Sequence, residues 1–482
     1  MVAKEKTAEL GERRAGLQHG GAARDRIAML LDPGSFVELG AFAKKRPTEL
    51  DIAREDVPAE SVVTGFGTVM SRPVYVFSQD IAAMGGALSE MHAKKITAVY
   101  DLAAKTGGPV VGFYDSKGAR LAEGVDAMNG YAEMIAKAAA LSGVVPQISI
   151  VCGICGGAAA IAASTADFII MSGGGELYMH SPTVVSSATG KDPAASGAAL
   201  AASGAAAFAF DSDGEAIGLV KKLLQMLPDN CEDGAYLFES PDDDNRLVDL
   251  SKIFISETDA LDIDMRALVA AIADDGEYIE PWAAYGASIT TAFICVGGMI
   301  AGVVAANGEL CADCASKAAG FVNFCDAFNI PLVTLVNTPG YKTSACFEKS
   351  GGIQAAAQLS AAFAAASVPK VTLVAGRAYG SGYVSMCPKG LGADLVYAWP
   401  GAQISIMSPQ SAAVMMYADE VAKAADPVAK RAEITARFGD TLASPYEAAA
   451  RGYVDDIIDP AETRKVILYS LDMLSSKKDG CC

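Results

Sequence analysis

The sequence predicts an α/β protein that contains two copies of one fold in a single chain. Three observations support this prediction. Landmark segments recur in the same order in both halves of the chain. Short apolar strands alternate with helical stretches, as in folds with largely parallel sheets. Hydrophobic residues make up 51% of the 482 residues, which is enough for sizeable cores.

The internal repeat appears in three pairs of segments, each an apolar strand followed by a turn of small or polar residues. The pairs are residues 108–120 with 330–342, 145–158 with 368–381, and 166–182 with 393–409. Their offsets are 222, 223 and 227 residues, and such a nearly constant spacing is hard to produce by chance. The polar stretch 227–246 separates the copies, so we expect an N-terminal domain at 1–235 and a C-terminal domain at 236–482.

Within the first copy, the segments "VVGFYD", "QISIVCG" and "FIIMS" predict buried strands, the second of them ending at Cys152. The segment "GYAEMIAKAAALSG" predicts a helix that ends at Gly143. Residues 286–307 carry no charge and have the length of a membrane span, but Gly297 and Gly298 divide them. A strand–turn–strand hairpin is therefore expected there instead.

Composition excludes several classes of function. A net charge of −19 argues against nucleic acid as a partner, because phosphate binding needs a basic face. The N-terminus is charged and lacks the apolar run of a secretory signal, and the odd number of 11 cysteines forms no regular framework. A cytoplasmic location is expected. The final Cys481 and Cys482 are interpreted as a frayed end rather than a lipidated tail.

The segment "VCGICGGAAAIAAS" at residues 151–164 admits three chemical interpretations. The pair Cys152 and Cys155 has the spacing of half a zinc site, but no second pair lies at ribbon spacing. The glycines match neither a Rossmann fingerprint nor a phosphate-binding P-loop. The third interpretation is a turn, residues 153–158, leading into a helix "AAAIAASTA", where unpaired N–H groups and the helix dipole form an oxyanion hole. A purely structural role of glycine in tight strand–helix packing stays open.

The second copy repeats this turn at residues 377–384, "RAYGSGYV", which suggests two oxyanion sites. Side chains for catalysis are scarce: the chain has three histidines, and none belongs to a recognisable nucleophile motif. This scarcity is consistent with a reaction driven by backbone donors and by a base that a cofactor supplies.

At this point the chain resembles the carboxyltransferase subunits of biotin-dependent acyl-CoA carboxylases, such as propionyl-CoA carboxylase β chains. It also resembles the closely related α subunits of sodium-pumping acyl-CoA decarboxylases. The resemblance covers nearly the whole chain. The segments that carry it are residues 26–42, 78–96, 115–125, 321–341, "AYGSGY" and "YAWPGAQISIMSP".

The resemblance implies two tandem crotonase-like domains and a homo-hexamer, with active sites between the N half of one subunit and the C half of another. Acyl-CoA binds mainly to the N half and biotin to the C half. Carboxybiotin releases carbon dioxide, the biotin anion takes the α-proton of the thioester, and the enolate attacks the carbon dioxide. This chemistry develops two oxyanions and needs no side-chain base.

Carried over by position, the resemblance assigns the catalytic backbone to Gly157, Ala158, Ser381 and Gly382. Both pairs depart from the family's Gly-Gly and Gly-Ala. On the biotin side the resemblance implies Tyr379, Gly380, Gly351 and Gly352. For the CoA phosphates it implies Lys117, Gly118, Arg120 and Lys94, with Lys95 beside them; a solvated surface charge is the alternative for each cation. Val384 occupies the position that helps to select acyl length, and no metal site is expected.

No lysine lies in a Met-Lys-Met context, so biotin is expected on a separate carrier protein, with a biotin carboxylase or a membrane decarboxylase subunit as a further partner. The leading hypothesis is carboxyl transfer to or from a short-chain acyl-CoA of the propionyl or methylmalonyl type. One alternative is the α subunit of a membrane decarboxylase acting on methylmalonyl- or glutaconyl-CoA. A second alternative is a non-catalytic CoA-binding or assembly subunit.

Overall fold

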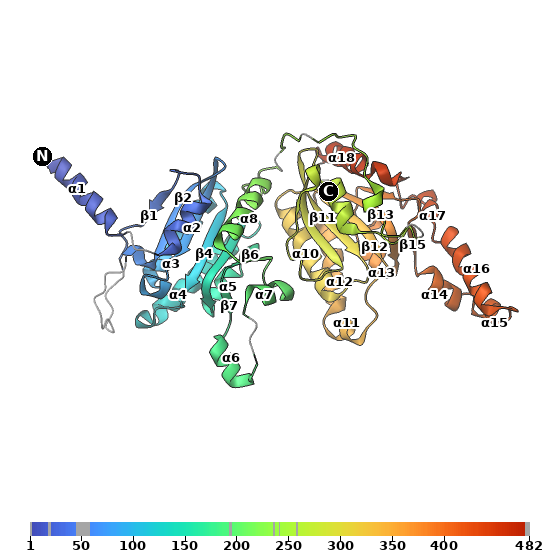
Figure 1. The fold of residues 1–482 in the computed structure, drawn as a ribbon, viewed down its shortest axis with the longest axis horizontal. Coiled ribbons are helices and arrows are strands. Elements are labelled where there is room, and N and C mark those ends of the chain that lie inside the picture. The colour runs from blue at the N-terminus through green and yellow to red at the C-terminus, as the bar shows by residue number, and fades with distance from the viewer. Residues whose placement is uncertain are drawn as a thin grey trace. The chain divides into compact units, whose positions relative to one another are not determined.

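The computed structural model describes residues 2–17, 21–44, 58–191, 195–234, 237–240, 242–256 and 259–477. The chain divides into two compact units, residues 1–233 and 234–482 (Figure 1). The predicted domain boundary between residues 235 and 236, together with Cys481 and Cys482, lies outside the described residues. Each unit is built around one sheet.

The N-terminal unit contains an eight-stranded sheet with the order β1-β2-β3-β4-β5-β6-β8, in which β7 also pairs with β5. Its first three strands are antiparallel neighbours, and the rest of the ladder is parallel. The strands are β1 (Val37–Leu39), β2 (Val62–Val69), β3 (Arg72–Gln79), β4 (Val110–Ser116), β5 (Gln147–Gly156), β6 (Phe168–Ser172), β7 (Glu176–Tyr178) and β8 (Phe208–Phe210).

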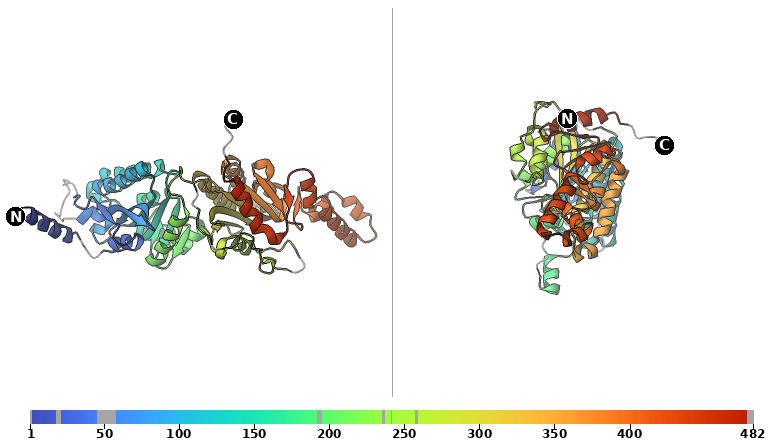
Figure 2. Two further views of the ribbon diagram at one scale, coloured as in Figure 1. Left: turned by 90° about the horizontal axis from the view of Figure 1, so that it is seen from above. Right: turned by 90° about the vertical axis from the view of Figure 1, so that its right-hand side faces the viewer.

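Helices cover both faces of this sheet (Figure 2). On one face α3 (Glu90–Thr106) and α4 (Val125–Ala140) bury Ile96, Val99 and Met134 against the strands. On the other face lie α2 (Ala22–Leu30) and α8 (Asp213–Met226). The remaining helices are α1 (Val2–Ala15), α5 (Ala158–Ala163), α6 (Pro182–Thr189) and α7 (Gly197–Ser203). A sheet buried on both sides explains why its strands are almost continuously apolar.

The C-terminal unit repeats this plan with the order β16-β14-β13-β12-β11-β10-β9, in which β15 also pairs with β13. The strands are β9 (Tyr278–Ile279), β10 (Ile289–Val296), β11 (Met299–Asn307), β12 (Leu332–Thr338), β13 (Lys370–Tyr379), β14 (Leu395–Ala398), β15 (Gln403–Ser405) and β16 (Asp456–Ile457). The helices are α9 (Met265–Ile272), α10 (Ala312–Ala327), α11 (Ala345–Lys349), α12 (Gly352–Ala365), α13 (Gly380–Ser385), α14 (Pro409–Met415), α15 (Ala418–Ala422), α16 (Pro427–Asp440), α17 (Pro445–Ala450) and α18 (Thr463–Leu474).

The predicted α/β fold with two related sheets is confirmed, and so is the hairpin. Strands β10 and β11 pair antiparallel around Gly297 and Gly298, both with positive φ. Among the described residues, no helix is long and apolar enough to cross a membrane.

Several expected boundaries were wrong: the end of β5, the end of α5 and both ends of α4, which begins at Val125 rather than at Gly130. Strand β5 continues past Cys152 to Gly156, because residues 154–156 gain a second parallel neighbour in β7. Helix α5 begins at Ala158 as expected, but it ends at Ala163 and so has six residues. Helix α4 ends at Ala140 rather than at Gly143, since the chain passes into turns that follow Leu141. Apolar periodicity could not show the extension of β5, because that extension depends on pairing with β7, a separate strand further along the chain.

A buried ion pair anchors the hairpin of the C-terminal unit. Both oxygens of Asp274 accept backbone N–H groups of the turn, one from Gly297 and one from Gly298, each at 2.9 Å. The fully buried Arg464 of α18 donates to the same carboxylate at 2.6 Å. These hydrogen bonds lower the pKa of Asp274 against the opposing effect of burial, which is the largest single influence on the group.

Replacing Arg464 with methionine is expected to destabilise the C-terminal unit by about 3–5 kcal/mol, because Asp274 would stay buried without a cation. The matched control is Lys465→Met on the same helix, whose partly exposed pair with Glu462 contributes only about 0–1 kcal/mol. Both tryptophans of the chain, Trp282 and Trp399, lie in this unit, so their fluorescence in a urea titration reports its unfolding. Equal losses in the two variants would contradict the assignment.

Candidate functional site

The junction between β5 and α5 depends on one glycine. Gly157 has φ +60° and ψ −125°, a conformation that residues with a side chain avoid. Its N–H donates to the carbonyl of Tyr178 in β7 at 2.9 Å, and its carbonyl accepts the N–H of Ile161 at 3.2 Å. Gly157 therefore joins strand to helix, and its own N–H is already used within the protein.

The first N–H group past this junction belongs to Ala158. As the first residue of α5 it has no carbonyl four residues back within the helix to accept its proton, and no backbone bond to it is recorded in the described part of the chain. The sequence-based assignment names Gly157 together with Ala158; because the Gly157 N–H is already used, the N–H of Ala158 is the one that this geometry leaves for a ligand. Because α5 has only six residues, we attribute the site to local N–H groups rather than to a long helix dipole.

A second turn lies beside this junction. Strand β4 ends at Ser116, which is in register with Cys155 of β5. Gly118 follows with φ +104°; its N–H donates to the hydroxyl of Ser116 at 3.1 Å, and its carbonyl accepts the N–H of Leu88 at 2.9 Å. The strand ends therefore bring residues 116–118 next to Gly157, as expected at the carboxyl edge of a parallel sheet.

The C-terminal unit contains the same pair of turns. Strand β13 passes into α13 at Gly380, with φ +52°, and β12 leads to Gly340, with φ +118°. The N–H of Gly340 donates to the Thr338 hydroxyl at 3.1 Å, as that of Gly118 does to Ser116. Gly380 therefore corresponds to Gly157, and Ser381 corresponds to Ala158.

By this correspondence, the counterpart of the Gly157–Ala158 pair is Gly380–Ser381, whereas the sequence-based assignment is Ser381–Gly382. Ser381 is exposed and stands in the first turn of α13. Gly382 is buried, and a Cβ there would lie 2.7 Å from the Cα of Gly340. Gly382 thus permits the two turns to approach closely, while the Ser381 N–H is the counterpart of the donor at Ala158.

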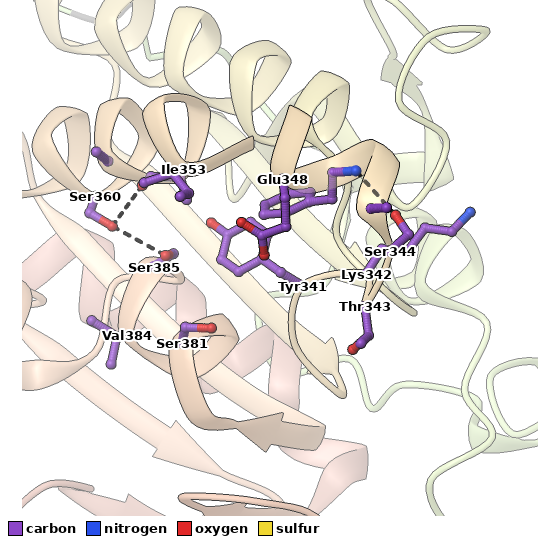
Figure 3. A pocket seen from close by; sticks show the side chains of 14 residues that line it. Tyr341, Lys342, Thr343, Ser344, Glu348, Ile353, Ser360, Ser381, Val384 and Ser385 are labelled. Carbon is purple, nitrogen blue, oxygen red and sulfur yellow. Dashed lines mark hydrogen bonds between the residues drawn. The ribbon is translucent and has the colours of Figure 1, made fainter. Parts of the chain in front are cut away.

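A groove of about 770 Å³ opens beside Ser381 in the C-terminal unit (Figure 3). It combines hydroxyl groups with apolar side chains, and in Figure 3 Ser381 and Val384 from α13 face Tyr341 and the α12 side chains. Ser360 donates to Ser385 at 3.2 Å across it. The lining residues that carry hydroxyl groups are Tyr341, Thr343, Ser344, Ser360, Ser381 and Ser385.

Three other residues predicted on this side do not line the groove. Tyr379 is buried, and its hydroxyl donates to Gln403. Gly351 begins α12 in the left-handed region with φ +82°. Gly352 is buried where a Cβ would lie 2.6 Å from the ring of Phe347, a lining residue.

The cations predicted for an anionic ligand differ in their availability. Lys117 is exposed on the turn after β4, and Lys94 is exposed on α3 in an ion pair with Glu90 at 2.6 Å. Arg120 is buried and donates to Glu60 and Glu123, so it is not a cation facing solvent as the sequence suggested. Lys95 is also buried, and its ammonium donates to the carbonyls of Ala59 and Val62.

Sequence reasoning missed the charged network below the first junction. Arg26 of α2 donates to Asp115 at 3.0 Å and to Asp213 at 2.8 Å, and all three lie close to Cys152. Asp115 immediately precedes Ser116, so the network holds the end of β4. No sequence signal could have shown it, because its members come from three distant segments.

The cysteines of the opening segment behave as small buried residues. Burial raises the pKa of the Cys155 thiol to about 12 and that of Cys152 still further. In the parts of the chain that the structure describes, no three His, Cys, Asp or Glu side chains gather as a metal site would require.

Comparison with known proteins gives one consistent result. Residues 20–481 match the family model described as the carboxyl transferase domain. The chain is 41% identical over 481 residues to the methylmalonyl-CoA carboxyltransferase 12S subunit of Propionibacterium freudenreichii subsp. shermanii, covering 97% of this chain and 92% of that protein. It is 40% identical over 475 residues to the methylmalonyl-CoA decarboxylase subunit alpha of Propionigenium modestum, covering 95% and 90%.

Among solved structures, the hexameric transcarboxylase 12S with hydrolysed methylmalonyl-coenzyme A bound matches with a TM-score of 0.93 and 40% identity. The match covers 99% of this chain and 96% of that one.

Gly157→Ala is expected to weaken the first junction by about 1–3 kcal/mol, because a side chain is strained at this φ and ψ. The new Cβ itself has room, since its nearest neighbour is the Met179 carbonyl at 3.9 Å. Hydrogen exchange should therefore accelerate at the amide of residue 157, which bonds Tyr178. Gly174→Ala is the control, because no atom lies within 4 Å and its φ is not positive. Unchanged protection at residue 157 would refute the role of the backbone strain.

Proposed function

Because the chain belongs to the carboxyl transferase domain family, we propose that it moves a carboxyl group between biotin on a separate carrier protein and a short-chain acyl-CoA of the propionyl or methylmalonyl type. The observation that carries this proposal is the pair of equivalent strand–helix junctions, at Gly157–Ala158 and Gly380–Ser381. Each offers a backbone N–H group in a setting of small residues. Two such donors suit a reaction in which two oxygens become negatively charged.

In the N-terminal unit, the Ala158 N–H is the proposed donor to the thioester oxygen. When the α-proton leaves a thioester, negative charge moves to that oxygen, and a fixed N–H stabilises it at no cost of reorganisation. Gly157 holds the donor in place, because its own N–H is bonded to Tyr178. The neighbouring turn at residues 116–118 forms the other wall of this site.

The groove beside Ser381 fits a biotin ring system. Biotin has a polar urea edge and an apolar body, and the groove combines hydroxyl groups with Ile353, Val384 and Phe347. The hydroxyl of Tyr341 lies in this lining beside that of Ser385, so the polar edge of a ligand can meet both hydroxyl groups there. When bound, biotin supplies the transferable carboxyl group and a urea nitrogen that can take up the α-proton. The Ser381 N–H would be the donor to the urea oxygen.

Lys117 and Lys94 are the proposed contacts for the phosphates of CoA in the N-terminal unit, because both are exposed on a protein of net charge −19. To bind a phosphate, Lys94 would have to leave its partner Glu90, which costs little free energy because the ion pair is exposed to solvent. Arg120 is omitted from this set, since Glu60 and Glu123 already neutralise it.

The proposed assembly and the second candidate role are based on the similar proteins. We propose a homo-hexamer, since the solved transcarboxylase 12S assembles as a hexamer. We also propose, from the family resemblance, that sites form between the N half of one subunit and the C half of another. A role as the α subunit of a decarboxylase is the second candidate, favoured by the 40% identity to such a subunit. The same residues serve both directions, because the transfer is reversible. We place the protein in the cytoplasm.

The decisive experiment incubates the purified protein with carboxylated biotin carrier and acetyl-, propionyl- or butyryl-CoA, and in reverse with methylmalonyl-CoA and the uncarboxylated carrier. Transfer to propionyl-CoA, and from methylmalonyl-CoA, is the expected result. The absence of transfer with every acyl-CoA in both directions would overturn the proposal and favour a non-catalytic CoA-binding subunit.

Ala158→Pro tests the N-terminal donor directly. Proline is tolerated at the first position of a helix but has no N–H. Removing one oxyanion donor typically lowers kcat about 10²–10³-fold, and a loss of this size is expected. Ala158→Ser keeps the N–H and should stay within about threefold of the parent kcat, since the donor is backbone. Equal activity of the proline and serine variants would rule out this N–H as a donor.

A further inference from the structure

A pair of cysteines unrelated to the two junctions stands at the start of α10. Cys311 precedes the helix as its N-cap, and its sulfur accepts the N–H of Cys314 at 3.2 Å. The two sulfurs lie 2.6 Å apart. A disulfide bond is about 2.05 Å long, so the bond could close with only a small rotation of the side chains.

The internal repeat shows that capping alone does not require sulfur. In the N-terminal unit the corresponding helix α3 begins at Ser89, whose hydroxyl accepts the N–H of His92 at 3.0 Å. The residue before each cap makes the same backbone bridge, Leu88 with Ala119 and Leu310 with Tyr341. Sulfur is a weaker acceptor than a hydroxyl oxygen and is not a preferred N-cap. The second unit has therefore exchanged a good cap for two thiols at the cap and at the third helical position.

The environment of the pair favours thiol chemistry. The hydrogen bond between the thiols lowers the pKa of Cys314 to about 6 and raises that of Cys311, so the pair carries one thiolate near neutral pH. The charged and titratable neighbours include Lys317 of the same helix, Asp313, Tyr341, and Tyr285, whose hydroxyl donates to Asp313 at 3.0 Å. Cys311 is partly exposed, whereas Cys314 is buried, so a reagent reaches Cys311 first.

We propose that Cys311 and Cys314 form a thiol–disulfide exchange site whose substrate is a low-molecular-weight disulfide. The Cys314 thiolate takes the proton of Cys311 across the contact between the two sulfurs, and the Cys311 sulfur then attacks one sulfur of that disulfide, forming a mixed disulfide and releasing the first small thiolate. Cys314 then attacks the sulfur of Cys311, forms the intramolecular bond and releases the second small thiol. The two cysteine sulfurs are oxidised and the small disulfide is reduced; because the pair carries one proton, the released products are one small thiol and one small thiolate.

The site lies one residue from the backbone that borders the groove. The N–H of Leu310 donates to Gly340 at 2.9 Å, and the N–H of Lys342 donates to Leu310 at 2.8 Å. An oxidised pair would therefore constrain the first turn of α10 next to Gly340 and Tyr341. The exchange chemistry itself does not rest on the proposed carboxyl transfer.

The test treats the reduced full-length protein with mixtures of reduced and oxidised glutathione, blocks the remaining thiols with a maleimide, and maps the peptides by mass spectrometry. In the parent chain the peptide with Cys311 and Cys314 is expected to lose two hydrogens and gain no glutathione. Cys346, a single exposed cysteine, provides an internal comparison and can form only a mixed disulfide. The pair should oxidise at least about tenfold faster than Cys346 reacts, because it carries a thiolate and a resolving thiol.

Two variants separate the roles. Cys314→Ser should accumulate the mixed disulfide on Cys311, because the resolving thiol is gone. Cys311→Ser reproduces the natural cap of Ser89, so it should keep the thermal stability of the parent while its buried Cys314 remains reduced. The proposal is overturned if the parent pair stays fully alkylated where Cys346 is glutathionylated, if Cys314→Ser traps no adduct at Cys311, or if Cys311 pairs with another cysteine.

Discussion

The candidate chemistry depends on one hydrogen bond, from the N–H of Gly157 to the carbonyl of Tyr178 in β7. This bond holds a glycine in a conformation that other residues avoid, and so turns the chain abruptly from the long strand β5 into α5. The turn leaves the next N–H, that of Ala158, without a partner at the edge of the sheet. In the second unit β15 pairs beside Tyr379, and Gly380 makes the same change of direction before Ser381.

Both units also contain an equivalent buried lysine that binds backbone carbonyl groups. Lys95 and Lys317 occupy equivalent positions on α3 and α10, and each buried ammonium donates to backbone carbonyls of an adjacent left-handed turn. Burial lowers the pKa of both lysines to about 8, which shows how strongly each ammonium is removed from water. These lysines stabilise backbone that no regular secondary structure satisfies.

The two units differ in their side chains at positions where different side chains can meet the same structural need. The caps Ser89 and Cys311 meet the same structural need with an oxygen and with a sulfur. Ala158 and Ser381 present different side chains on equivalent backbone, which suits donors whose strength does not depend on the side chain. By contrast, any side chain at residue 382 would collide with the backbone of Gly340.

The sequence alone determined the repeat, the α/β class, the hairpin around Gly297 and Gly298, and the segments where each glycine-rich turn lies. These features are local, because strand periodicity, turn residues and spacing are written in consecutive residues. Only the tertiary structure decided which backbone N–H groups and which cationic side chains already have partners within the protein, and which glycines lie against other backbone. It paired the Gly157 N–H with Tyr178, closed Arg120 between two carboxylates, and placed Gly382 against Gly340. Those outcomes depend on partners from distant segments, which no local pattern specifies.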